Sequence, residues 1–92
     1  MRDYSFKLSL YLTTPGHPEI FEAIQNLKDF LNEELKQDFE LHIINVLQNP
    51  ERAAKDGVIA TPTLIKEMPP PSLRIVGDFT DRKKVLAALG LS

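Results

Sequence analysis

The sequence contains no cysteine, which excludes disulfides, thiol redox chemistry and cysteine-ligated zinc or iron–sulfur sites. It has only two histidines, His17 and His42, and they stand far apart in the chain. A histidine-based metal site therefore has few ligands to draw on. We predict neither a metal nor a cofactor.

A basic excess and long apolar runs are also missing. The formal net charge of −2 argues against a nucleic-acid-binding protein, which normally carries a basic patch. No apolar run approaches the roughly 18–20 residues that a membrane span needs, and the N-terminus lacks a signal-peptide apolar region. We therefore expect a cytoplasmic protein without nucleic-acid or membrane partners. Its 92 residues fit a single domain spanning 1–92.

Hydrophobic spacing predicts four strands and three helices. Residues 6–12 alternate, with Phe6, Leu8, Leu10 and Leu12 on one face, as in a strand with one side on a core. The strand at 39–47 becomes apolar on both sides, which is typical of a strand near the centre of a sheet. The remaining expected elements are helices at 18–35, 50–56 and from Asp78 or Thr80 to Gly90, and strands at 58–66 and 72–77.

The predicted order is β-α-β-α-β-β-α. Strands joined by a helix are expected to run parallel with a right-handed crossover, and a tight connection between the last two strands predicts an antiparallel hairpin. The pattern is that of the thioredoxin fold, an α/β three-layer sandwich around a mixed sheet. In that fold a cis proline precedes the third strand, where Pro62 stands here. The resemblance favours cis, while a trans proline at the start of an edge strand is the alternative.

A second proline block follows the third strand. Residues 68–71 cannot lie in the middle of a sheet, because proline donates no hydrogen bond to a neighbouring strand. We expect them to form a stiff, polyproline-like connector.

The stretch ATPTLIKEMPPPSLRIVGDFTDRKKVL, which includes this block, resembles the KaiB family of bacterial circadian clock proteins. The shared features are Ala-Thr-Pro-Thr-Leu, a lysine, three prolines, an arginine with Gly-Asp, and the start of the last helix. Upstream, LSLYL and IINVLQNPERA are also similar to the family. The positions that carry the structural part of the match are Pro62, Pro69, Pro70, Pro71, Gly77 and Asp78.

This resemblance implies a protein that is not an enzyme. KaiB proteins dock on the ATPase ring of KaiC and help to sequester KaiA. They adopt two folds, a ground state, often tetrameric, with a rearranged C-terminal half, and a thioredoxin-like monomer. Switching members typically have Gly and Asp where this chain has Ala88 and Gly90. Alanine favours a helix interior, and losing an acidic group at a helix C-terminus relieves a dipole conflict. We therefore expect the thioredoxin-like form to be favoured.

The resemblance also implies a KaiC-binding surface around the short second helix, with Lys66 nearby in the third strand. The other implied contact residues are Val46, Leu47, Gln48, Asn49, Pro50, Arg52, Lys55 and Asp56. Two alternatives stay open. Asn49 and Pro50 suit the start of a helix, and Arg52 and Lys55 suit an ordinary solvated face.

A KaiA partnership is disfavoured by departures from the family. The second-strand positions implied in KaiA contact are Glu40 and His42, and the latter replaces a lysine. Three positions that are commonly basic in the clock proteins are Glu22, Gly57 and Leu73 here. Charge changes at an interface alter association rates and partner choice.

Two other functions remain possible on the sequence alone. The chain resembles in fold the sensor domain of the SasA histidine kinase, which competes for the same ring. Alternatively, it is a cysteine-free thioredoxin-fold protein that binds a thiol such as glutathione, or an extended peptide. The loop TTPGHP, with Thr13, Thr14 and His17, stands where a redox thioredoxin has its two cysteines. Helix initiation by Pro18 is the simpler explanation of that loop.

Overall fold

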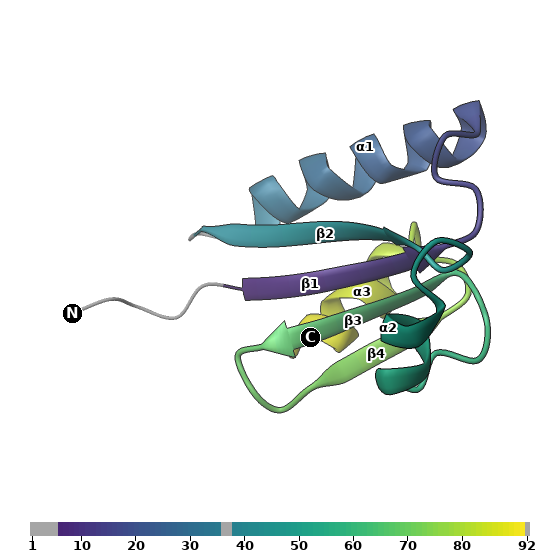
Figure 1. The fold of residues 1–92 in the computed structure, drawn as a ribbon. Coiled ribbons are helices and arrows are strands. Elements are labelled where there is room, and N and C mark those ends of the chain that lie inside the picture. Colours follow the sequence, from purple (N-terminus) through teal and green to yellow (C-terminus); the bar gives the residue numbers. More distant parts are fainter. Residues whose placement is uncertain (1–5, 36–37, 92) are drawn as a thin grey trace.

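A computed structural model describes residues 6–35 and 38–91 (Figure 1). The predicted order of strands and helices is confirmed. The elements are β1 (Phe6–Leu12), α1 (Pro18–Glu34), β2 (Phe39–Asn45), α2 (Pro50–Lys55), β3 (Thr63–Met68), β4 (Leu73–Val76) and α3 (Arg82–Leu89).

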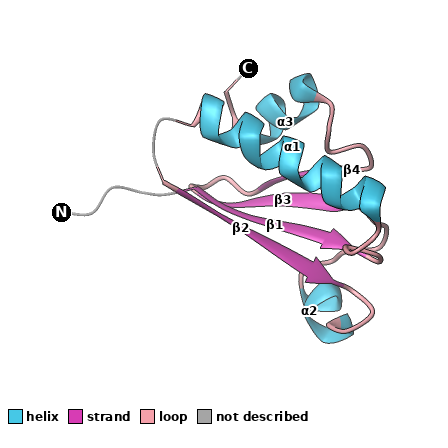
Figure 2. Ribbon diagram, turned by 90° about the horizontal axis from the view of Figure 1, so that it is seen from above, coloured by secondary structure: helices cyan, strands magenta, loops and turns pink. Residues whose placement is uncertain are grey.

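The strands form one mixed sheet in the order β2-β1-β3-β4. β1 pairs in parallel with β2, while the β1–β3 and β3–β4 pairs are antiparallel. α1 and α3 cover one face of this sheet and α2 lies on the other, so the molecule has three layers (Figure 2). The thioredoxin-like three-layer prediction is therefore confirmed.

The expectation that every helical connection joins parallel strands is wrong at α2. The 17 residues of α1 span about 25 Å, enough to carry the chain back along β1, whose seven residues span about 23 Å. The six residues of α2 span only about 9 Å. The chain therefore enters β3 near the end where it left β2, and β3 runs antiparallel to β1.

β1 and β2 exchange the positions that the sequence suggested. β1 is a central strand and is buried on both faces, because Ser9 and Tyr11 lie beneath the α2 side while Leu8 and Leu10 face α1 and α3. β2 lies at an edge of the sheet rather than near its centre. β2 ends at Asn45, so the apolar residues Val46 and Leu47 lie in the loop to α2 rather than in the strand.

The last element is a helix, as predicted, but it begins later. Asp81 is its N-cap and accepts hydrogen bonds from the backbone N–H groups of Lys83 (3.0 Å) and Lys84 (3.3 Å). Asp78 instead accepts from the backbone N–H of Thr80 at 2.8 Å. Hydrogen bonds from the Thr80 hydroxyl and backbone lower the pKa of Asp78.

The helix ends as the sequence indicated. Gly90 has the left-handed φ of 78° that closes α3, and Ala88 is buried inside the helix.

Both proline segments adjoin β3. The Thr61–Pro62 peptide bond is cis, and the Pro62 carbonyl accepts from the Gly77 N–H at 2.8 Å. The prediction of a polyproline-like connector at residues 68–71 is wrong in extent and conformation. Met68 belongs to β3, and the peptide bonds preceding Pro69 and Pro71 are cis. These turns place β4 beside β3.

Candidate docking surface around α2

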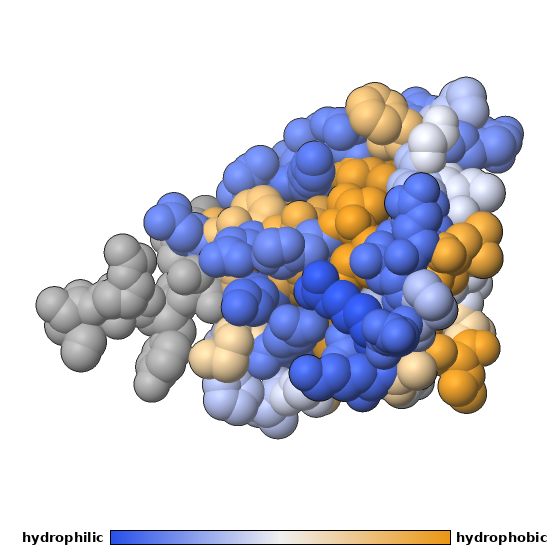
Figure 3. All heavy atoms as spheres, in the orientation of Figure 1, coloured by the Kyte–Doolittle hydropathy of each residue, from blue (hydrophilic) through white to orange (hydrophobic). Residues whose placement is uncertain are grey.

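The residues around α2 form the surface that the sequence singled out. Within the run from Val46 to Asp56, most of the implied contact residues are exposed, and Val46 and Asp56 are half-buried. Leu47 is 72% exposed, and Ile59, in the loop after α2, is 98% exposed. Figure 3 shows hydrophobic atoms at the end of the molecule where these loops lie, beside a largely hydrophilic front. We call residues 46–59 the α2 surface.

The loop that leads into α2 is organised by Asn45. Its side-chain oxygen accepts from the Leu47 N–H at 2.9 Å, and its carbonyl accepts from the backbone N–H (3.0 Å) and side chain (2.9 Å) of Asn49. Asn49 is the N-cap by position, but its side chain makes no capping hydrogen bond to α2. Pro50 follows at the first helical position. These contacts support the helix-start alternative for Asn49 and Pro50.

Tyr11 fastens α2 to the sheet from below. Its ring is fully buried in a small cluster with Ile44, Ala53 and Ile65, and its hydroxyl donates to Asp56 Oδ2. Burial, followed by the hydrogen bond to Asp56 and that carboxylate's negative charge, raises the pKa of Tyr11 to about 12. The nearby Arg52 guanidinium offsets part of this rise. The phenol is thus protonated at neutral pH and available as a donor.

Arg74 fastens the same C-terminal end of α2 through the backbone. From the exposed side of β4, its Nη2 donates to the Asp56 carbonyl at 2.9 Å and its Nη1 to the Gly57 carbonyl at 3.4 Å. Gly57 has φ +70°, which glycine adopts without strain and which turns the chain away from the helix. A guanidinium here also complements the negative end of the helix dipole.

A polar hollow of about 440 Å³ lies between α2 and β3. Its lining carries both signs of charge, with Glu51, Arg52, Lys55 and Asp56 from α2 and its C-cap, and Glu67 from β3. The Ser9 hydroxyl donates to Glu67 at 2.9 Å, tying β1 to β3 beneath this hollow. Within residues 6–35 and 38–91, no group of three or more His, Cys, Asp or Glu side chains is placed to hold a metal. The arrangement suits recognition by charge and shape.

Lys66 does not join the α2 surface. It alternates with Ile65 along β3, and Ile65 packs against the Tyr11 cluster under α2. Lys66 is only 3% exposed, and its Nζ lies 3.9 Å from the point that a Cβ on Gly90 would occupy. It therefore points to the α3 side, where its charge complements the C-terminal end of α3. The prediction that Lys66 lies beside the implied contact residues is therefore wrong.

Glu40 and His42 lie on the outer strand β2 and pair with each other. His42 Nε2 and Glu40 Oε1 are 2.9 Å apart, and both side chains are about half exposed. The hydrogen bond to His42, with help from the charges of Lys7 and His42, lowers the pKa of the Glu40 carboxyl. Because Ile44 lies on the same face of β2, at two-residue spacing, and packs beneath α2, both belong to the α2 side of the sheet.

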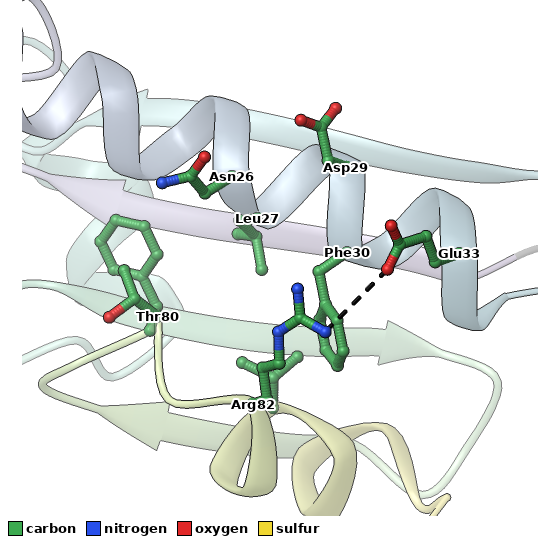
Figure 4. Close-up of a pocket in the computed structure, with 9 residues that line it drawn as sticks. Asn26, Leu27, Asp29, Phe30, Glu33, Thr80 and Arg82 are labelled. Carbon is green, nitrogen blue, oxygen red and sulfur yellow. Dashed lines mark ion pairs between the residues drawn. The ribbon is translucent and has the colours of Figure 1, made fainter.

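A second hollow, of about 370 Å³, lies between α1 and α3 (Figure 4). Arg82 crosses it, with its guanidinium 4.8 Å from the centre of the Phe30 ring and 4.0 Å from Glu33. Two thirds of the Arg82 side chain is nevertheless exposed. The hollow belongs to the packing of α3 on α1 and lies on the opposite side of the sheet from the α2 surface (Figures 2 and 4).

The polar contacts on the α2 face of the sheet were not predicted from the sequence. Tyr11 and Arg74 hold α2 in place, and Ser9 joins Glu67 of β3. The polar side of the β1 alternation was a usable signal, since a strand with Ser9 and Tyr11 on one face needs hydrogen-bond partners if that face is covered. The identity of those partners depends on contacts between distant parts of the chain.

Comparisons with known proteins agree on one family. The family model of the KaiB domain matches residues 10–91. A circadian clock oscillator protein KaiB from Microcystis aeruginosa is 42% identical over 87 residues, covering 95% of this chain and 83% of the relative. The KaiB protein of Trichodesmium erythraeum is 41% identical over 87 residues, with the same coverage.

A solved structure also shares the fold. The solution structure of the N-terminal domain of Synechococcus elongatus SasA superposes with a TM-score of 0.79, covering 100% of this chain and 90% of that one, at 23% identity. Such a low identity supports the thioredoxin-like fold alone. No helix in the described parts of the chain is both long and apolar enough to cross a membrane.

Proposed function

The chain belongs to the KaiB family, and from this premise we propose that it docks on the ATPase ring of a KaiC-type protein. In this role it is a non-enzymatic clock or signalling protein that modulates the phosphorylation cycle or timing of the ring. The thioredoxin-like form is the docking form. The proposal places the contact on the α2 surface.

The observation that carries this proposal is the exposure of large apolar side chains on a surface built by a fixed framework. Leu47 and Ile59 stand out from the two loops that flank α2. Removing such side chains from water on binding contributes roughly 1.5–3 kcal/mol each when burial is complete. Val76, which is 57% exposed, adds a further apolar side chain on the α2 side of β4, since it lies two residues from Arg74. These residues are suitable anchors for a partner.

The charged residues of the α2 surface suit orientation and association rate. Arg52 and Lys55 are exposed on α2, whereas the Asp56 carboxylate is already engaged by Tyr11. Exposed charges at the rim of an interface steer encounter and make binding depend on salt. We therefore assign Arg52 and Lys55 to direct contact with the partner and Asp56 mainly to support.

The test is co-elution of the chain with a KaiC-type ATPase and ATP on size-exclusion chromatography with light scattering. Leu47→Ala and Ile59→Ala should each weaken the complex, because each removes an exposed anchor without opening a core cavity. The matched control is Lys66→Met, a change on the opposite face of the sheet, which should leave binding unchanged. Failure of the unaltered chain to co-elute would contradict the proposed docking.

The fold likeness to the SasA N-terminal domain supports a second candidate, a sensor domain of a histidine kinase. A SasA-type sensor domain added to the KaiC-type complex distinguishes the two. Displacement of this chain supports a KaiB-like competitor for the ring, whereas phosphorylation of a kinase only when this chain is fused to it supports the sensor role. We assign no KaiA contact to Glu40 and His42, because they pair with each other and His42 replaces the family's lysine.

A further inference from the structure

We propose that Tyr11 and Arg74 are positioning residues for docking, which hold Asp56 from both sides and thereby fix the orientation of α2. The inference rests on the proposed function. Neither residue is among the contact positions that the family resemblance implies. Tyr11 lies below α2, and Arg74 reaches its C-terminal end from β4.

α2 needs such support because little else holds it. It has six residues, and only Ala53 is buried. Helices of this length are marginal in water without tertiary contacts. The N-cap side chain does not stabilise its first turn by a capping hydrogen bond. The small Ala53 methyl group alone removes little apolar surface from water.

Tyr11 supplies the fixed point beneath the helix. It belongs to β1, which is flanked by β2 and β3, and its side chain has no exposed surface. Because β1 is a central strand and the Tyr11 ring is packed on all sides, the position of the hydroxyl is fixed. Its bond to Asp56 therefore defines how far the last turn of α2 stands from the sheet.

Arg74 supplies the second attachment and acts on the backbone. Its guanidinium binds the carbonyls of Asp56 and Gly57 in a forked arrangement. The side chain of Asp56 is thus held by β1 and its main chain by β4. Because the Asp56 N–H donates to the Arg52 carbonyl at 3.0 Å, fixing Asp56 also fixes the turn that carries Arg52.

The experiment compares three substitutions in the full chain. Tyr11→Phe keeps the ring and removes the bond to Asp56, and Arg74→Gln removes the fork. Ser9→Ala is the matched control, because it deletes a similar hydroxyl–carboxylate bond on the same face that does not touch α2. Amide hydrogen exchange of residues 53–58 reports the helix directly, and titration against a KaiC-type ATPase with ATP reports docking.

We expect Tyr11→Phe to speed exchange in residues 53–58 about fivefold, the effect of losing one hydrogen bond, and Arg74→Gln to speed it at least as much, since Arg74 makes two. Affinity for the ATPase should fall by a similar factor, while exchange in α1 and α3 stays unchanged. Ser9→Ala should alter neither quantity. Arg74→Lys should recover part of the loss, since it keeps the charge but not the fork.

Three results would overturn the inference. One is unchanged exchange at residues 53–58 in both Tyr11→Phe and Arg74→Gln. A second is faster exchange at residues 53–58 with full affinity, which would separate the orientation of α2 from docking. If the unaltered chain does not bind the ATPase at all, the proposed function fails, and the exchange measurement still decides whether Tyr11 and Arg74 hold α2. Faster exchange throughout α1 and α3 would show general destabilisation and would also count against the inference.

Discussion

The two faces of the sheet differ in how they are packed. On the α1/α3 face, fifteen buried apolar residues of the described chain form one cluster, which joins α1 and α3 to β1, β3 and β4. Partly buried side chains of the outer strand β2 pack against this cluster. On the α2 face, the buried cluster among the described residues is smaller and consists of Tyr11, Ile44, Ala53 and Ile65. Hydrogen bonds from Tyr11 and Arg74 supply much of the remaining attachment of α2. The larger apolar cluster places most of the stabilising burial on the first face, and the second face carries the surface of the proposed docking.

The sharpest test of this division uses two neighbouring residues of β3. Leu64 and Ile65 are both buried but point to opposite faces, Leu64 into the large cluster and Ile65 into the small one. Leu64→Ala should lower the free energy of unfolding by about 2–5 kcal/mol, the range for a large cavity in a closed core. Ile65→Ala should fall at the lower end of that range, because the short α2 above it can settle into the space. Urea denaturation of both variants measures the difference.

The same pair separates stability from recognition. Ile65→Ala should weaken binding to a KaiC-type ATPase more than Leu64→Ala does under conditions where both remain folded. Equal losses of stability and binding in the two variants would remove the distinction between the faces.

Local patterns were enough to predict the elements, because most of their signals lie within a few residues. The alternation of β1, the Asn49-Pro50 start of α2 and the Gly90 end of α3 all appear where the sequence places them. Errors arose where several candidates were equivalent. Asp78, Thr80 and Asp81 can all cap a helix by chemistry, and only the path of the chain after Gly77 selects Asp81.

Contacts between distant segments were beyond the sequence. Tyr11 and Asp56 are 45 residues apart, and Arg74 and Asp56 are 18 apart. These contacts of Asp56 depend on β1 being a central strand of the sheet. The apolar runs in β1 and β2 did not indicate which of these two strands is central. Lys66 shows a different limit, since its family motif implied a partner contact while its two-residue spacing from Leu64 already indicated the α3 side.

Raising the pH should weaken the α2 face selectively. Burial and the Asp56 carboxylate raise the pKa of Tyr11 from an ordinary value of 10 to about 12. Because the folded protein holds this proton more tightly, its stabilising contribution is complete below pH 10 and is lost as pH rises through about 12. Absorbance of the phenolate gives the titration. The chain has two tyrosines, and Tyr11→Phe leaves Tyr4 as the reference.

The difference spectrum of the unaltered chain and Tyr11→Phe should therefore titrate near pH 12 in the folded state and near 10 in urea. The advantage of the unaltered chain over Tyr11→Phe in denaturant midpoint should shrink as pH rises from 10 towards 12, since a phenolate cannot donate to Asp56 and is repelled by its carboxylate. A Tyr11 titration near 10 in the folded protein would mean that the phenol is open to solvent and does not anchor α2.

The smallest predicted effect concerns the end of α3, and it tests whether the α1/α3 face needs a particular backbone turn there. Gly90 has φ +78°, and a Cβ at this position would meet only Lys66 Nζ at an ordinary 3.9 Å. Gly90→Ala should therefore lower stability by about 1–2 kcal/mol through the left-handed backbone alone. Gly16→Ala is the matched control, because its Cβ would enter open space and its φ is not left-handed. Thermal and urea unfolding of both variants measure the effect. Similar stability of the two would show that the α1/α3 face does not need a left-handed glycine at the end of α3.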